Sequence, residues 1–294
     1  IALSVHHLSA FGVHDFGSEE LKKTYLPRLF SGEWLGAYAL SEASSGSDAA
    51  SLTTKAEKTS AGYRLTGAKR FISHGGEAEF YLVMARTGGS GPKGISAFAV
   101  EQGWPGFEFG KLEEKMGWQA SPMRELIFEG CEVPAENLVG EEGQGFTIAL
   151  AGLDSGRLGI AACSVGLAQA AFDAAVAFAR ERRQFGRAVI EFQGLQFMLA
   201  DMATQIEAAR RLYREAARLR DAGEKYTIAA SMAKLFASDM AMRVTTDAVQ
   251  VHGGYGYMRE YPVERYMREA KALQIVEGTN QVQRMVIGRH LAGG

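Results

Sequence analysis

An abrupt change of hydrophobic pattern near residue 145 limits the folds that this chain can adopt. Before it, six short runs have the character of β-strands, at 36–40, 63–73, 80–86, 95–100, 107–111 and 125–128. Glycine and proline separate these runs, so we expect an antiparallel sheet or a small barrel. After residue 145 the β-type runs disappear and apolar side chains recur at helical spacing. The chain is therefore predicted to be α+β, with its strands and its long helices in separate segments.

The C-terminal half is predicted to consist of long packed helices. Its clearest apolar stripe steps by three and four residues and contains Leu195, Leu199, Met202, Ile206, Ala209 and Tyr213. A turn is expected at 221–223, followed by a second long helix over 226–252. Gly253 and Gly254 are the expected stop of that helix.

The first 34 residues are also predicted to be helical. Ser18 is expected to cap a helix that has Glu19 and Glu20 in its first turn. One face of this helix is apolar and contains Leu21, Tyr25, Leu26 and Leu29. A segment of this length is too short to be an independent domain.

Three domains are predicted from these patterns. They are a helical remnant over 1–35, a β domain over 36–144 and a helical bundle over 145–294. The chain begins with Ile1 instead of methionine, so we expect a fragment or a processed product.

Composition excludes several classes of function. Hydrophobic residues make up 47% of the chain and charged residues 22%, as in ordinary soluble proteins, and the net charge of −2 gives no general attraction to nucleic acid or membranes. Cys131 and Cys163 are the only cysteines, so we expect a reducing compartment and no metal site. The most apolar segment, 146–179, is interrupted by charged residues such as Asp154 and Arg157, which predicts a buried helix and not a membrane span.

Glu277 is the candidate for proton transfer. It lies between the apolar pair Ile275 and Val276 and a Gly-Thr-Asn turn that is predicted to open the last helix. At such a place the helix N-terminus lowers the pKa of a carboxyl, whereas burial beside apolar groups raises it. A general base that removes a weakly acidic proton near neutral pH needs the second effect to prevail. The alternative is that the carboxylate only complements the helix dipole.

Two further segments lie in the β part. Residues 38–47 form a strand and then a loop rich in hydroxyl and small side chains, which suits either a polar ligand or a surface turn. Phe71 and Ser73 lie on the same side of a predicted strand end. That pair is suited to pack on and hydrogen-bond a flat ring, although an amphipathic strand has the same pattern.

Two segments in the helical part also allow both a structural and a ligand-binding interpretation. Residues 180–187 are a cationic helix end followed by a turn, suited to dipole compensation or to phosphate pairing. Residues 250–257 contain three glycines and two tyrosines, which indicates a close approach by the backbone, but their spacing is not that of a nucleotide-binding loop. His252 is expected to be a structural hydrogen-bonding residue and not a metal ligand.

Together these segments resemble the acyl-CoA dehydrogenase family of flavoproteins over essentially the whole chain. The family's flavin loop, Tyr/Phe-x-x-Ser/Thr-Glu-Pro-x-x-Gly-Ser-Asp, is matched by 38–48, with Ala43 in place of the proline. Four other family motifs are matched in order: the flavin-stacking strand by 71–73, the Arg-x-x-Phe-Gly turn by 182–186, the Gly-Gly-x-Gly motif by 253–256 and the Glu-Gly-Thr motif by 277–279. The resemblance implies a remnant of an N-terminal helical domain, a central antiparallel β domain and a C-terminal four-helix bundle.

The resemblance also implies roles for individual residues. Glu277 is implied to be the base that removes the α-proton of an acyl-CoA while the β-hydride passes to FAD, since the position used by another branch is Gly156 here. Contacts with FAD are implied for Tyr38, Leu40, Ser41, Gly46, Ser47, Phe71, Ser73, Thr279 and Gln281. Residues implied to reach the FAD of a neighbouring subunit are Arg182, Phe185, Gln193, Gln250 and Gly254. Substrate contacts are implied for Ser47, Asp154, Arg157 and Gly278.

The substrate class follows from the same resemblance. Segments 87–96, 117–134 and 231–239 are most similar to the isobutyryl-CoA branch, which implies a short or short-branched acyl-CoA. A butyryl-CoA or 2-methylbutyryl-CoA dehydrogenase is the alternative enzyme. A truncated, non-catalytic paralogue that serves as a scaffold is the alternative from another class. An oxidase or monooxygenase is disfavoured, because such relatives usually lack Glu277.

Partners and compartment are implied as well. Electron transfer flavoprotein is the expected electron acceptor. A cofactor shared between subunits implies a homo-oligomer, expected to be a tetramer built as a dimer of dimers. The expected location is the bacterial cytoplasm, or the mitochondrial matrix if the protein is eukaryotic. The opening helices of the family are absent from the chain.

Overall fold

The computed structural model describes residues 2–293, and the chain divides into two compact units. The first unit comprises the chain up to Lys115 together with Gln119–Gly156. The second comprises Met116–Trp118 together with the chain from Arg157 onward. Ile1 lies outside the described residues. Helix α3 (Gly145–Glu181) contributes its first part to one unit and the remainder to the other.

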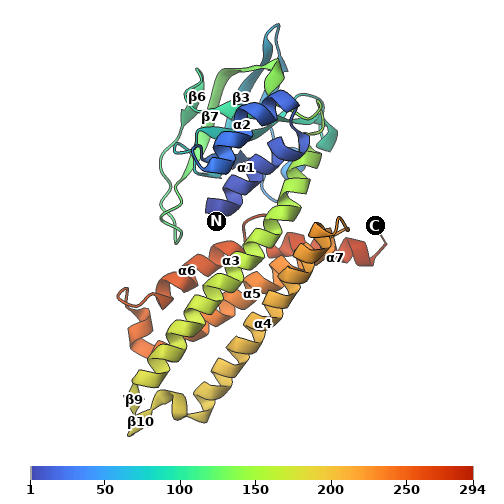
Figure 1. Ribbon diagram of the computed structural model, residues 1–294. Coiled ribbons are helices and arrows are strands. Elements are labelled where there is room, and N and C mark those ends of the chain that lie inside the picture. The colour runs from blue at the N-terminus through green and yellow to red at the C-terminus, as the bar shows by residue number, and fades with distance from the viewer. Residues whose placement is uncertain (1, 294) are drawn as a thin grey trace. The chain divides into compact units, whose positions relative to one another are not determined.

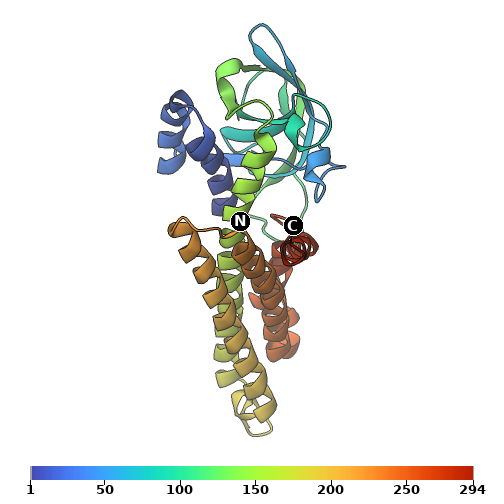
Figure 2. The ribbon, with the colours of Figure 1, turned by 90° about the vertical axis from the view of Figure 1, so that its right-hand side faces the viewer.

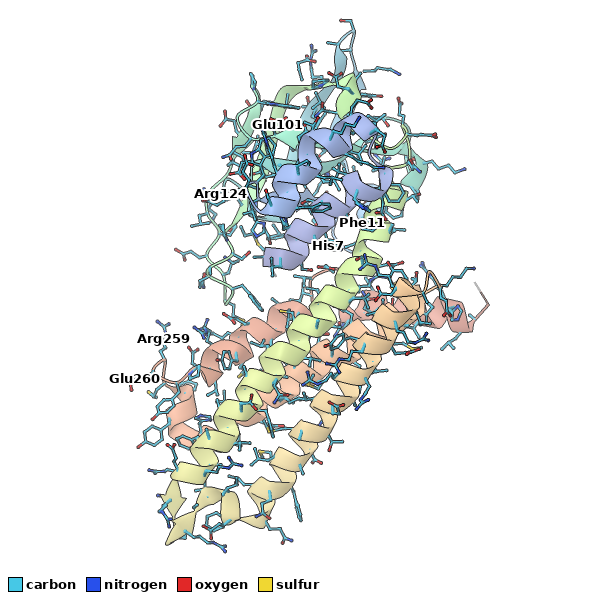
Figure 3. All side chains as sticks on the ribbon, viewed as in Figure 1. His7, Phe11, Glu101, Arg124, Arg259 and Glu260 are labelled. Atoms are coloured by element: carbon cyan, nitrogen blue, oxygen red, sulfur yellow. The ribbon has the colours of Figure 1, made fainter. Side chains whose placement is uncertain are left out.

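Two helices open the first unit, α1 (Ala2–Phe16) and α2 (Glu19–Ser31), and they lie beside the sheet (Figure 2). The predicted cap is confirmed: Ser18 Oγ accepts a hydrogen bond of 3.2 Å from the backbone N–H of Leu21. All four predicted apolar residues of α2 are buried. Tyr25 also donates a hydrogen bond of 2.8 Å to Glu101, labelled in Figure 3, and so ties α2 to the sheet.

The sheet of the first unit contains eight strands. They are β1 (Gly36–Ala39), β2 (Lys55–Lys58), β3 (Gly62–Ser73), β4 (Phe80–Arg86), β5 (Ile95–Glu101), β6 (Phe107–Phe109), β7 (Met123–Pro134) and β8 (Leu138–Val139). Their order is β6-β7-β3-β2-β4-β5-β8, with β1 paired to β4. The predicted antiparallel arrangement holds except that β1 and one residue pair of β2 run parallel to β4. The parallel pairing is possible because β2 and β3 intervene and return the chain in the same direction.

Two strands differ from the sequence prediction for local reasons. Strand β2 was not predicted because only Ala56 of its four residues is buried, which leaves no apolar alternation. Strand β7 is longer than the predicted run at 125–128 and continues to Pro134. Gly130 has a φ of 70° at a register shift between β7 and β3, so the strand bulges there and does not end.

The second unit is a helical bundle with a small hairpin (Figure 1). Its further helices are α4 (Gln193–Asp221), α5 (Thr227–His252), α6 (Val263–Leu273) and α7 (Asn280–Leu291). The predicted stripe of α4 is confirmed, since its apolar residues are buried in or packed against a core formed with α3, α5 and α6. The turn predicted after the cationic end of α3 is a hairpin of β9 (Arg183–Gln184) and β10 (Arg187–Ala188).

Helix α3 is long and apolar enough to cross a membrane by length and composition alone. Its side chains, however, fill the protein cores. Ile148 and Ala149 are buried in the first unit, whereas Ala161, Val165 and Ala168 are buried in the second. Packing within the protein therefore accounts for its apolar composition.

Candidate active site

The hydroxyl-rich loop follows strand β1 in the first unit. Tyr38 is partly buried and donates a hydrogen bond of 3.3 Å to the carbonyl oxygen of Ala149, and Leu40 is buried. Ser41 is partly buried, and its carbonyl oxygen accepts a hydrogen bond of 2.8 Å from the N–H of Arg70. Gly46 and Ser47 are exposed. The base of the loop is thus anchored, while its tip presents backbone and hydroxyl groups.

A buried ion pair that the sequence analysis missed fixes this loop. The ammonium of Lys69, which is fully buried, lies 2.8 Å from Glu42 Oε1 and also donates to the carbonyl oxygen of Leu40. Glu42 further accepts hydrogen bonds from Thr53 and Thr54. Burial opposes ionisation of Glu42, but the Lys69 ammonium and these hydrogen bonds hold the pKa of Glu42 well below its usual range. The only sequence signal was a lysine at an inward position of a strand.

Phe71 and Ser73 lie at the end of β3. The register between β3 and β7 shifts between Lys69 and Ile72, and Phe71 has a φ of 60°. Phe71 is 59% exposed, Ile72 is buried and Ser73 is partly buried. A left-handed backbone costs a non-glycine residue about 1–2 kcal/mol. Strain of this kind at an exposed aromatic ring points to a binding role.

Glu277 lies in the second unit, in the turn between α6 and α7. The turn is left-handed at two successive residues, with φ of 53° at Glu277 and 87° at Gly278. Glu277 is partly buried and its Oε2 atom is shielded from solvent. Thr279 caps α7, as its Oγ1 accepts a hydrogen bond of 3.3 Å from Val282, and Gln281 is exposed in the first turn. The predicted helix after the Gly-Thr-Asn turn is confirmed.

A second buried cation that the sequence analysis missed holds this turn. Lys234 of α5 is fully buried and donates to Gly278 O at 2.9 Å and to Asn280 Oδ1 at 2.8 Å. Gln283 Nε2 donates to the carbonyl oxygens of both Glu277 and Gly278. Burial lowers the pKa of Lys234 to about 8, although the charge of Glu277 opposes this. The available signal was a lysine on a helix face of alanines.

The remaining predicted substrate residues lie on α3. Arg157 is 4% exposed, and its Nη1 donates a hydrogen bond of 3.4 Å to Ser231 Oγ of α5. It lies beside the Glu277 turn, since a Cβ built on Gly278 would be 3.9 Å from Arg157 Nη2. Asp154 is partly buried and belongs to the first unit. The structure thus brings Arg157, Gly278 and Glu277 together within the second unit.

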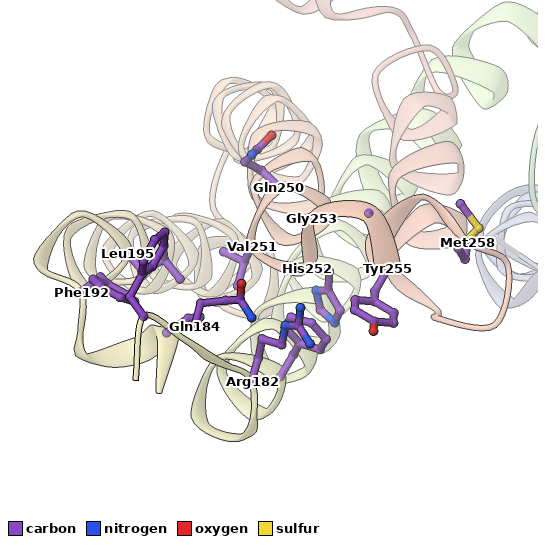
Figure 4. Close-up of a pocket in the computed structure, with 14 residues that line it drawn as sticks. Arg182, Gln184, Phe192, Leu195, Gln250, Val251, His252, Gly253, Tyr255 and Met258 are labelled. Atoms are coloured by element: carbon purple, nitrogen blue, oxygen red, sulfur yellow. The ribbon is translucent and has the colours of Figure 1, made fainter. Parts of the chain in front are cut away.

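A pocket of about 570 Å³ in the second unit brings together four of the five residues predicted to reach a neighbouring subunit's cofactor (Figure 4). Arg182, Phe185, Gln250 and Gly254 line it, whereas Gln193 is exposed at the start of α4 and is not among the lining residues.

Within this pocket, the Arg182 guanidinium lies 5.3 Å from the centre of the Tyr255 ring. Phe185 has a φ of 50° and is 94% exposed. His252 has the expected structural role, because it is buried, bonds to Ala248 O at 2.8 Å and stacks on Phe178.

Comparison with known families gives two matches along the chain. Residues 37–131 match the middle domain of acyl-CoA dehydrogenases, and residues 143–292 match the C-terminal domain of acyl-CoA dehydrogenases. These two segments contain every residue singled out above for proton transfer or ligand contact.

Known relatives resemble the chain over nearly all of its length. An acyl-CoA dehydrogenase of Bacillus subtilis is 52% identical over 100% of this chain and 78% of its own. The mitochondrial isobutyryl-CoA dehydrogenase of Dictyostelium discoideum is 49% identical over 99% of this chain and 70% of its own.

Solved structures show the same fold. Butyryl-CoA dehydrogenase from Megasphaera elsdenii superposes with a TM-score of 0.98 at 49% identity, over 99% of this chain and 77% of that one. A chain from a study of the electron transferring flavoprotein of Acidaminococcus fermentans superposes with a TM-score of 0.97 at 54% identity, with the same coverage. The predicted fold is therefore confirmed.

Proposed function

The chain belongs to the acyl-CoA dehydrogenase family of enzymes, and from that premise we propose that it converts a short or short-branched acyl-CoA to the enoyl-CoA with FAD as cofactor. The observation that carries this proposal is the Glu277 turn. A carboxylate is held there in a left-handed backbone, with one oxygen shielded from solvent and Arg157 alongside. Backbone strain that the surrounding structure maintains is characteristic of functional positions.

Glu277 is the proposed base. Its carboxylate accepts the α-proton of the thioester as that C–H bond breaks, and the electron pair released forms the α,β double bond as the β-hydride leaves. The α-proton of a thioester is a weak acid in water, so the base needs an environment that excludes water and stabilises charge at the thioester carbonyl. Ser47, Asp154, Arg157 and Gly278 are proposed to contact the acyl-CoA.

The residues around the first-unit loop fit FAD. An exposed ring at Phe71 offers a flat apolar surface, and Ser41 and Ser73 offer hydroxyls nearby in the same unit. The proposed set in this unit is Tyr38, Leu40, Ser41, Gly46, Ser47, Phe71 and Ser73. Bound FAD would supply the isoalloxazine ring that accepts the β-hydride.

The second unit is proposed to complete the cofactor site. Thr279 and Gln281 are proposed to contact FAD at the start of α7. The pocket beside Arg182 is proposed to receive part of the cofactor of a neighbouring subunit, with Arg182, Phe185, Gln193, Gln250 and Gly254 in contact. The pocket suits this role because it combines aromatic rings with a cation that can pair with phosphate.

The names of the relatives support a short acyl chain. Isobutyryl-CoA and butyryl-CoA dehydrogenases are both close to half identical to this chain. These equal identities support a short or short-branched acyl-CoA. We infer an isobutyryl-CoA type of substrate from the resemblance of segments 87–96, 117–134 and 231–239 to that branch, with butyryl-CoA or 2-methylbutyryl-CoA as the alternatives.

We further infer that electrons pass to an electron transfer flavoprotein. We also infer a tetrameric assembly and a location in the bacterial cytoplasm or in the mitochondrial matrix.

The test is anaerobic bleaching of the flavin by isobutyryl-CoA and by butyryl-CoA, in the wild type and in Glu277→Gln. Loss of a general base is expected to slow bleaching by roughly 100- to 10,000-fold. The matched control is Glu260→Gln, the same change at an exposed residue in the loop before α6 (Figure 3), which is expected to bleach at the wild-type rate.

The bleaching rates with the two substrates show which acyl group the site prefers. Wild-type protein that binds flavin but is bleached by no short acyl-CoA would refute the dehydrogenase and favour a non-catalytic scaffold. Bleaching by Glu277→Gln at the wild-type rate would instead remove Glu277 from the role of base.

A further inference from the structure

Lys234 is a buried cation whose hydrogen bonds all lead toward the Glu277 turn. It is 0% exposed on α5, on a buried face that also contains Ala230, Ala237 and Ser238. Removing an ammonium from water is unfavourable unless good partners replace the water. An alanine or leucine would pack this core without that cost, so the lysine requires an explanation from its partners.

Its partners are the backbone and the cap of the turn. The ammonium donates to Gly278 O at 2.9 Å and to Asn280 Oδ1 at 2.8 Å. Asn280 is itself fixed, because its Nδ2 donates to Ser238 Oγ at 2.9 Å and to Asp239 Oδ1 at 2.7 Å. Lys234 therefore links the rigid helix α5 to the residue that follows Glu277.

The turn needs such support. Glu277 adopts a φ of 53°, which a non-glycine residue avoids, and Gly278 follows at 87°. The carbonyl oxygen of Gly278 receives hydrogen bonds from both Lys234 and Gln283, at 2.9 Å and 3.0 Å. Two donors on this carbonyl fix the Gly278–Thr279 peptide plane, and Gln283 Nε2 also donates to Glu277 O at 3.3 Å, so both peptide planes that follow Glu277 are held in place.

We propose that Lys234 is a positioning residue for the reaction: its buried ammonium holds the Glu277–Gly278 turn in the left-handed conformation and compensates the charge of the base. This rests on the proposed function of Glu277. The charged groups that act on the ammonium are Glu277 in the turn, Arg157 of α3 and Asp239 of α5. Because Arg157 has the same sign as Lys234, the two cations together favour the ionised form of Glu277.

The test compares Lys234→Met with the wild type, per bound flavin, at saturating isobutyryl-CoA. A base displaced by about 1 Å can lose roughly 100-fold in rate, so kcat is expected to fall by about 10- to 100-fold with KM changed less than about threefold. Loss of the cation disfavours the ionised base, so the acidic limb of the kcat profile is expected to move to higher pH. The isotope effect of α-deuterated substrate is expected to rise, because proton removal becomes slower.

The matched control is Thr245→Val, which removes a buried hydroxyl from the same helix without contact to the turn. It is expected to keep the wild-type kcat, isotope effect and pH profile. If Lys234→Met does not fold, Asn280→Ala tests the proposal in its place, because it removes one acceptor of the ammonium. It is expected to lower kcat by a smaller factor and to raise the isotope effect in the same way.

The outcomes distinguish a failure of the proposal for Lys234 from a failure of the proposed function. If Lys234→Met lowers only thermal stability or flavin content, with kcat per flavin and the pH profile unchanged, Lys234 is merely structural and the proposal is overturned. If the wild type itself does not bleach, the proposed function fails first. If the wild type bleaches and Glu277→Gln does not, the result for Lys234→Met concerns Lys234 alone.

Discussion

Replacing Glu42 by glutamine should destabilise the first unit far more than an ordinary loop substitution. In the structure, Oε1 accepts from Lys69 Nζ and Thr54 N, and Oε2 accepts from Thr53 N and Oγ1. The amide of glutamine has only one oxygen, so its NH₂ must face one of these two donor pairs in either orientation. The change also leaves the Lys69 ammonium buried without its counter-charge. Breaking a buried ion pair in this way costs about 3–5 kcal/mol.

The measurement is urea unfolding of the flavin-loaded protein, with flavin release followed in parallel. A double variant, Glu42→Gln with Lys69→Met, removes the uncompensated charge and is expected to recover about 2 kcal/mol of the loss. Because the pKa of Glu42 is depressed in the folded state, its contribution is complete above its ordinary value of 4.5 and is lost as the pH falls below it. The difference in free energy of unfolding between the wild type and Glu42→Gln should therefore become smaller at acidic pH.

Two results would refute this reasoning. One is a Glu42→Gln protein whose free energy of unfolding lies within about 1 kcal/mol of the wild-type value, since a solvent-exposed ion pair contributes no more than that. The other is a double variant no more stable than the single one, since the ammonium would then not be the source of the cost.

Three further changes test the cofactor and substrate residues. Phe71→Ala should weaken flavin binding by about 1 kcal/mol in addition to the loss of buried apolar area, because ring stacking is removed. Phe30→Ala, at a similarly exposed residue of α2, should leave flavin retention in a dialysis assay unchanged. Gly278→Ala should slow flavin bleaching strongly, because its φ is 87° and a Cβ would lie 2.7 Å from Gln283 Nε2, while Gly288→Ala in open space on α7 should keep the wild-type rate. Arg182→Gln should lower flavin retention, and the deficit should shrink as salt is added.

The fold was largely predictable because it follows from local patterns. Alternation in β3 and the three-to-four stripe of α4 each reflect one buried face, whereas β4 and β5 are buried on both faces and are continuous runs of buried residues, so the pattern alone indicates each element. The pattern failed at β2, where a single buried alanine carries no periodicity. It failed again at Gly130, because a glycine in a bulge and a glycine that ends a strand look alike in sequence.

The site was predictable only in part, for a different reason. Motifs indicated which segments would meet a ligand, but they did not indicate what holds those segments in place. Lys69 and Lys234 are paired with residues 27 and 46 positions away in the chain, Glu42 and Asn280. No local rule predicts such pairs, because a lysine on an inward face becomes informative only when its partner is known.

Residues with a left-handed backbone differ in how the protein compensates the strain. Five described non-glycine residues have positive φ, namely Phe71, His74, Trp118, Phe185 and Glu277. In His74 and Trp118 the side chain is tied to a carbonyl, Gly36 O at 3.0 Å and Glu269 O at 2.8 Å, which compensates the cost within the protein. Phe71 and Phe185 are 59% and 94% exposed, and each has a ring contact instead of a hydrogen bond: the Arg70 guanidinium lies 5.6 Å from the centre of the Phe71 ring, and the rings of Phe185 and Phe192 are 6.1 Å apart. Strain at residues that remain this exposed is expected where a bound group supplies further contacts. On this argument the cofactor should stabilise the Phe71 bulge and the Phe185 turn, and both segments should show slower amide exchange when flavin is bound.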